Sequence, residues 1–169
     1  RAAAWFGAHA LTDEAIAHFL RAGDAPSAAR LIEEQVHSLL DQENWRQLER
    51  WLAQLPAEIR QRPALLTAQA ALHFLHYRFA LIGPLLDAAE EALVQEPILS
   101  QAARLPLQGE IARLRACVAY NDDDAGAMLH WAEIARQKLR PEMQYAMGLA
   151  DFFFIIGLHA SGRDEAAVA

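Results

Sequence analysis

Apolar residues recur every three or four positions along nearly the whole chain, and no segment alternates with the two-residue period of a strand. Leu31, Ile32, Val36, Leu39 and Leu40 illustrate the pattern. Side chains at this spacing lie on one face of an α-helix, and that face leaves water only by packing against a neighbouring helix. The sequence therefore predicts an all-α fold.

Capping and helix-breaking residues divide this pattern into segments joined by short connections. We expect a short helix over residues 1–10, a second that begins after an N-cap at Thr12 and ends at Gly23, and a third capped by Asp24. Further helices are predicted over residues 44–55, 63–77, 79–94, 101–120, 123–139 and 143–160, with one helical turn in the 57–63 connection. Connections this short place consecutive helices antiparallel.

Tight polar turns recur near Arg78, Asp123 and Arg163, about 40 to 45 residues apart, which is the period of a helical repeat. Small residues such as Gly83 and Ala127 follow these turns and would let paired helices approach closely. We predict a right-handed superhelix of antiparallel helix pairs, a tetratricopeptide-like α-solenoid. Residues 1–62 would form a helical segment that leads into degenerate repeats over residues 63–169, the last of them truncated.

Three consecutive aspartates, Asp122 to Asp124, could be a metal site or a helix cap. They precede a helical segment, where carboxylates accept hydrogen bonds from free amides and interact favourably with the helix dipole. A calcium loop would need alternating ligands and a closing Glu twelve positions on, and neither is present. We interpret the aspartates as capping residues.

Charge and cysteine content exclude several classes of protein. The chain has 22 acidic and 15 basic residues, a net charge of -7, so we expect no direct contact with nucleic acid. The single Cys117 rules out an internal disulfide and fits a reducing, cytoplasmic location. No apolar run is long enough to span a membrane, and the chain begins without methionine, as an excised piece of a longer protein would.

Nothing in the sequence points to catalysis or to a bound metal. His73 and His76 have a spacing that could hold a metal, but two ligands alone are a weak signal, and we interpret them as packing or solvated residues. Cys117 lies in an apolar stretch with no base beside it, as a buried, inert thiol would. We predict no enzyme, no metal and no cofactor in this chain.

Four residues are candidates for lining a ligand groove: His73, Arg113, Arg115 and Asp151. Asp151 is the one charge in an apolar helix, and a buried carboxylate needs a partner, which Arg113 or Arg115 could provide. The alternative is a plain ion pair or a solvent-facing Asp151. The run from Phe152 to Ile156 covers all sides of that helix, so we also expect exposed apolar surface there and possible self-association.

The segments "RAAAWFGAHALTDEAIAHFLRAGDAPSAARLIEE" and "WRQLERWLAQLPAEIRQRPALLTAQAAL", and the turn "HYRFA", resemble the MalT-like group of LuxR-type bacterial regulators. These are signal-responsive transcription factors of the STAND ATPase class. The resemblance covers the full chain and is most specific in its first 80 or so residues. It implies a position after the ATPase and winged-helix modules, at the start of a repeat superhelix that takes up an inducer or a regulatory protein.

The resemblance also implies that ATP binding and DNA binding belong to other parts of such a protein. This chain has no phosphate-binding G-x-x-x-x-G-K-[S/T] motif and no basic recognition helix. The segment "LLTAQAALHFLHY" also lacks the Trp and Gly expected in the first helix of a tetratricopeptide repeat. A small-molecule inducer or a regulatory protein is the expected partner. The alternatives are a stand-alone tetratricopeptide adaptor, which this acidic chain with one lysine fits less well, and an all-helical enzyme, for which no polar cluster is evident.

Overall fold

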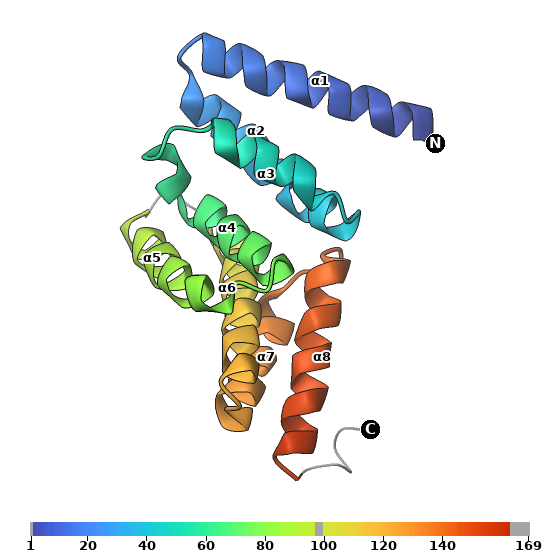
Figure 1. Ribbon diagram of the computed structural model, residues 1–169, viewed down its shortest axis with the longest axis vertical. Coiled ribbons are helices and arrows are strands. Elements are labelled where there is room, and N and C mark those ends of the chain that lie inside the picture. The colour runs from blue at the N-terminus through green and yellow to red at the C-terminus, as the bar shows by residue number, and fades with distance from the viewer. Residues whose placement is uncertain (1, 97–99, 163–169) are drawn as a thin grey trace.

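The computed structural model of the protein describes residues 2–96 and 100–162, with side chains described from residue 11 onward. Over these residues it has eight α-helices, two short 3-10 helices and no strand (Figure 1). The α-helices are α1 (Ala2–Arg21), α2 (Ala25–Asp41), α3 (Trp45–Gln54), α4 (Pro63–Leu75), α5 (Ile82–Gln95), α6 (Gln101–Asn121), α7 (Ala125–Lys138) and α8 (Gln144–Ala160). The 3-10 helices are Ile59–Gln61 and Phe79–Leu81.

Consecutive helices pack as antiparallel neighbours, α4 with α5, α6 with α7 and α7 with α8 (Figure 1). Beyond these neighbours, α6 also contacts α4 on one side and α8 on the other. This arrangement confirms the predicted all-α solenoid of stacked helix pairs. The division at residue 62 stays a prediction, because the main hydrophobic cluster runs across it from Ile16 to Phe153.

Five helix ends share one turn geometry, in which the second residue after the helix has a positive φ. After the first four, the N–H of the next residue donates to the carbonyl five positions earlier at 2.8 or 2.9 Å, which is the Schellman pattern. The five residues are Gly23, Glu43, Tyr77, Asp123 and Gly162, with φ between 56° and 76°. The predicted stop at Gly23 and the turns near Arg78 and Asp123 are thereby confirmed.

Two of these turns are closed by an aspartate cap. Ser27 N donates to Asp24 Oδ1 at 3.1 Å, and Ala127 N donates to Asp124 Oδ1 at 2.9 Å. No group of three or more metal-ligating side chains is found within the part of the chain that the structure describes. The capping interpretation of the aspartate run is therefore confirmed for Asp124.

The predicted break at Thr12 is wrong, because α1 continues without interruption from Ala2 to Arg21. No Gly or Pro lies near Thr12, and a continuous helix satisfies backbone groups that two new helix ends would leave without partners. A threonine inside a helix costs only a few tenths of a kcal/mol, roughly 0.5, relative to alanine. Trp5 and Phe6 lie outside the residues whose side chains are described.

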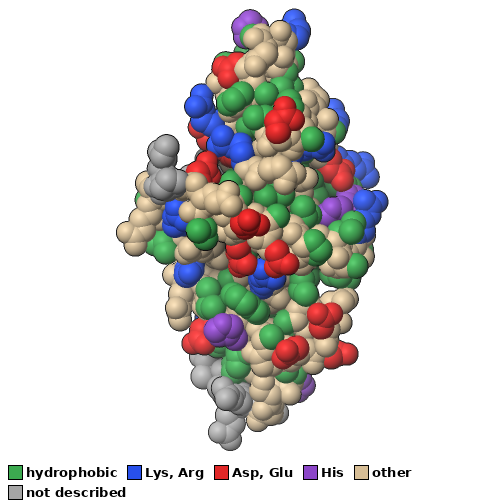
Figure 2. Space-filling view, turned by 90° about the vertical axis from the view of Figure 1, so that its left-hand side faces the viewer, with side chains coloured by type: hydrophobic (Ala, Val, Ile, Leu, Met, Phe, Trp, Pro, Cys, Tyr) green, Lys and Arg blue, Asp and Glu red, His purple; other side chains and the backbone are tan. Residues whose placement is uncertain are grey.

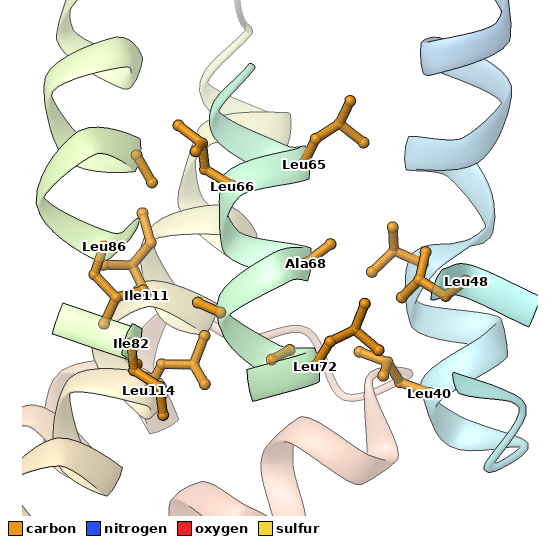
Figure 3. Close-up of a cluster of buried hydrophobic side chains, with 14 of the residues drawn as sticks. Leu40, Leu48, Leu65, Leu66, Ala68, Leu72, Ile82, Leu86, Ile111 and Leu114 are labelled. Atoms are coloured by element: carbon orange, nitrogen blue, oxygen red, sulfur yellow. The ribbon is translucent and has the colours of Figure 1, made fainter. Parts of the chain in front are cut away.

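The core is a continuous apolar layer between neighbouring helices (Figure 3). Ala68 and Leu72 of α4 lie between Leu40 and Leu48 on one side and the α5–α6 residues on the other (Figure 3). A second buried cluster joins α6, α7 and α8 and consists of Ala112, Ala135, Leu139, Met143, Ala146 and Ala150. The many alanines allow close approach, because they place little bulk between the helices.

One glycine is required for this close approach. A Cβ at Gly109 of α6 would lie 2.8 Å from Leu139 N, which is shorter than real contacts allow. The segment between α7 and α8 therefore passes directly over α6 at this point. No described helix is both long and apolar enough to cross a membrane.

Candidate functional site

A groove of about 960 Å³ lies beside α2 in the described structure. Its walls come from α2, the first turn of α4, the first two turns of α6 and the segment that joins α7 to α8. The lining residues are Arg30, Glu33, Glu34, His37, Ser38, Asp41, Gln42, Ala64, Ala103, Pro106, Leu107, Arg140, Glu142 and Met143.

Helical spacing explains why these residues face the groove. On α2, Arg30, Glu33, His37 and Asp41 recur at three- and four-residue steps and form one polar stripe. The apolar stripe of the same helix, with Ile32 among its members, is buried in the core. The amphipathic character of α2 thus separates the core side from the groove side.

A much smaller pocket of about 30 Å³ opens from the groove. The two cavities share Glu33, His37, Ala64 and Leu107 as lining residues. The pocket continues inward to Val36, Leu40, Thr67, Ala68, Ala71 and Glu110. Its lining therefore contains two carboxylates and one imidazole but no lysine or arginine.

Glu110 and Arg113, one turn apart on α6, form a buried ion pair beside this pocket. Glu110 is 2% exposed and Arg113 is 0% exposed. Arg113 Nε and Nη2 donate to Glu110 Oε2 at 3.1 and 2.8 Å. The guanidinium carbon also lies 5.9 Å from the ring centre of Phe74, a cation–π distance. The pair is therefore neutral as a unit. Each charge is stable in the interior because its partner offsets the cost of removing it from water.

The second oxygen of Glu110 faces His37. Glu110 Oε1 lies 3.6 Å from His37 Nδ1, which is beyond hydrogen-bond distance. The His37 side chain is 42% exposed, whereas that of Glu110 is 3% exposed. His37 thus stands between the buried carboxylate and the open groove.

The rim of the groove carries more acidic than basic groups. Glu33 is neutralised by Arg62, whose Nε and Nη2 donate to its two oxygens at 2.6 and 2.9 Å. This hydrogen bonding raises the pKa of Arg62. Asp41 Oδ1 accepts a hydrogen bond from Tyr145 N at 2.9 Å, and Arg140 donates to the carbonyl of Ala102.

The structure does not bring the four predicted groove residues together. Arg113 lies beneath the groove, bound to Glu110, and does not line it. His73 is in the last turn of α4, where its Nδ1 is buried without a hydrogen-bond partner and burial lowers its pKa. Neither residue is among those that line the groove or the inner pocket.

Arg115 lies on the side of α6 that faces α5, and it does not line the groove. It donates to Asp87 Oδ1 and to Glu90 Oε2, both at 2.6 Å, and its guanidinium lies 6.0 Å from the ring centre of Trp131. Figure 2 shows the side of the molecule that carries α5, where acidic side chains gather beside a basic one. Arg115 thus joins α5, α6 and α7.

Asp151 pairs with a residue that the sequence interpretation did not consider. Arg136 Nε donates to Asp151 Oδ1 at 2.7 Å, and the two side chains are 43% and 48% exposed. The expected pairing with Arg113 or Arg115 is therefore wrong, and the alternative of a plain ion pair is confirmed. The reason is that Arg113 and Arg115 are already neutralised by acidic residues nearer in space.

Sequence reasoning missed Glu33, His37 and Glu110, which form the inner pocket. A signal for Glu110 was present, since a Glu and an Arg three residues apart within the otherwise apolar stretch of α6 predict a buried pair. No comparable signal existed for Glu33 or His37, because a polar stripe on a helix usually faces bulk water.

The amino-acid sequence is similar to that of a known protein. The chain is similar to a bacterial transcription regulator. It is 29% identical over 157 residues to the HTH-type transcriptional regulator MalT of Klebsiella pneumoniae. The match covers 92% of this chain and 17% of that protein. None of the protein-family models matches the chain, and no solved structure matches it.

The similarity covers only a small part of the relative. The chain spans about a sixth of the relative's length, 17%, so it corresponds to one segment of a much larger regulator. This supports a distant relation to MalT-like regulators, in agreement with the resemblance seen in the sequence.

Proposed function

We propose that this chain is the sensor segment of a bacterial transcription regulator and that its groove takes up the signal. In this proposal the segment binds an inducer or a regulatory protein and catalyses no reaction itself. ATP binding and promoter recognition would belong to other parts of the whole protein, which would act in the cytoplasm.

The observation that carries the proposal is the groove of about 960 Å³ that residues of α2, α4 and α6 line. Stacked helix pairs form extended concave surfaces, and such surfaces bind partners more often than they catalyse reactions. A cavity of this size falls within the range of small-molecule sites, roughly 300–1,000 Å³. The similarity to a transcription regulator over 92% of the chain supports the same reading.

The four walls of the groove suggest how binding could be transmitted. Its residues come from α2, α4, α6 and the segment before α8, so one ligand would contact helix pairs that are distant in sequence. A ligand that prefers one relative arrangement of these pairs would shift the population toward that arrangement. The rest of a longer regulator could respond to this shift.

The test is chromatin immunoprecipitation of the complete protein that contains this segment, in its native host. We expect enrichment at discrete promoters, and we expect Ala64→Leu, which narrows the groove, to change that occupancy. Ala53→Leu is the matched control, because Ala53 is an exposed residue of α3 that lines neither cavity. Absence of promoter enrichment for the unaltered protein would refute the proposal.

A further inference from the structure

We infer that the inner pocket binds the protonated primary amine of a ligand whose chain lies in the groove. This inference rests on the proposed function, since it names the chemistry of the signal.

The pocket is small enough to select its occupant. A cavity needs roughly 10–15 Å³ to hold one water molecule. A pocket of about 30 Å³ therefore accommodates one ammonium group with its first methylene. A planar guanidinium or an aromatic ring is too large. Aliphatic side chains, including Leu40, Ala68 and Leu107, line the pocket and would contact the methylene group.

The polar groups of the lining favour a hydrogen-bond donor. Glu33 and Glu110 both line the pocket, and neither lysine nor arginine does. Arg62 neutralises Glu33, and Arg113 neutralises Glu110 through Oε2, so Glu110 Oε1 is the carboxylate oxygen left to accept a hydrogen bond. An ammonium group could donate to this oxygen, whereas an anionic ligand could not.

One atom of the pocket is ready to accept a hydrogen bond. Glu110 is 2% exposed, and the structure gives its Oε1 no hydrogen bond, because the nearest donor, His37 Nδ1, is 3.6 Å away. This oxygen can accept a hydrogen bond, and an ammonium group supplies three donors.

The outer groove suits a ligand with a second positive charge. Glu34 and Glu142 are exposed carboxylates on its rim, and no residue in the described part of the chain forms an ion pair with them. Arg30 and Arg140 on the rim keep their positive charges, since they bind the neutral acceptors Ser27 Oγ and Ala102 O. The carboxylates of Glu34, Asp41 and Glu142 outnumber them. A diamine would therefore place one ammonium in the pocket and the other at the rim.

The test is isothermal titration calorimetry of the 169-residue chain with cadaverine, a five-carbon diamine. We expect binding of one cadaverine per chain and no detectable binding of 1,5-pentanediol, which has the same length and no charge. Butylguanidine, which carries a guanidinium and no amine, tests the size limit when it is compared with pentylamine, and we expect it to bind more weakly. Equal binding of the diol and the diamine, or no binding of either, would overturn the inference.

Leucine substitutions at two alanines, one in the pocket and one outside it, test where the amine binds. Ala64 lines both cavities and is partly exposed, so Ala64→Leu should block the pocket entrance without disturbing the core. We expect the affinity for cadaverine to fall by about tenfold or more, whereas Ala53→Leu should leave it unchanged within about twofold. Equal affinity of the two variants would place the binding elsewhere and contradict the inference. Circular dichroism checks that both variants fold.

Two sources of the amine are separated by the choice of probe. Lysine capped at both ends represents a lysine side chain of a partner protein, and cadaverine represents a free metabolite. Stronger binding of capped lysine assigns the pocket to a partner's side chain, and stronger binding of cadaverine assigns it to a metabolite. Promoter occupancy without amine binding would refute only this inference, while amine binding without promoter occupancy would refute only the proposed function.

Discussion

Asp41 and Tyr145, 104 positions apart, are joined by a hydrogen bond from Tyr145 N to Asp41 Oδ1 at 2.9 Å. Tyr145 N belongs to the first turn of α8, whose N-terminal amides lack partners within the helix. The last residue of α2 therefore caps α8, a role that a residue just before the helix usually fills. This contact closes one end of the groove.

Asp41→Ala should lower the free energy of unfolding by about 1 kcal/mol, the usual value of a lost helix cap. The physical reason is that an amide of α8 loses its acceptor. Urea unfolding followed by circular dichroism measures the change. Glu34→Ala on the same helix is the control, since the structure gives Glu34 no hydrogen bond to the described residues. An equal loss in both variants would mean that the cap contributes nothing.

Gly109→Ala should destabilise the protein by roughly 1–3 kcal/mol, because the new Cβ meets the backbone of Leu139 at 2.8 Å. Leu139 N belongs to the main chain, so it cannot move aside as a flexible side chain would. Gly148→Ala in α8, where nothing lies within 4 Å, should instead stabilise by about 0.5–1 kcal/mol. The midpoints of thermal unfolding should therefore shift in opposite directions.

Asp123→Gly should raise stability by about 0.5–1 kcal/mol, because Asp123 has a φ of 56°, a region in which glycine is unstrained. Its neighbour Asp122 has a φ of -92°, so Asp122→Gly should lower stability by a similar amount. The two substitutions differ by one position and exchange the same residue types. If both destabilise equally in chemical denaturation, the turn geometry is not as described.

Removal of Arg113 alone should be far more harmful than removal of the whole ion pair. Arg113→Met leaves Glu110 charged and buried without its partner, which should cost about 3–5 kcal/mol. The double variant Glu110→Leu with Arg113→Met should recover most of that loss, because no buried charge remains. Unfolding free energies of the two single variants and the double variant measure the coupling. A double variant as unstable as the sum of the single variants would contradict it.

Cys117 should make stability fall at alkaline pH. Burial raises the pKa of the Cys117 thiol to about 11, whereas an exposed thiol titrates near 8.5. Between these two values the unfolded chain loses its proton while the folded chain keeps it, so the free energy of unfolding falls as pH rises. Cys117→Ala should remove that part of the pH dependence. In the folded wild-type protein the thiol should react slowly with Ellman's reagent at about pH 8, and urea should accelerate the reaction.

The helices and turns could be predicted from the sequence because they depend on neighbours within a few positions. Gly23, Asp24 and Asp124 act through hydrogen bonds to residues one turn away, and the sequence places them at the helix ends. The prediction at Thr12 failed although it used the same kind of local signal. The capping preference of Thr12 was outweighed by the backbone hydrogen bonds that one continuous helix forms.

The candidate site could not be predicted in the same way. Glu33 and His37 lie on the polar stripe of α2 and are indistinguishable in sequence from residues that face bulk water. Their role in the groove depends on α6, which brings Glu110 and Leu107 beside them. Arg113 and Arg115 were predicted to line the groove or to pair with Asp151, but each has its own acidic partner in space.

The sequence by itself determined an all-helical chain of stacked pairs, because apolar periodicity and helix-end chemistry act over short separations. Only the tertiary structure decided where the cavities are, which charges are buried and which residues meet across the groove. Those properties depend on the distances between helices, and close approaches such as the one at Gly109 set these distances.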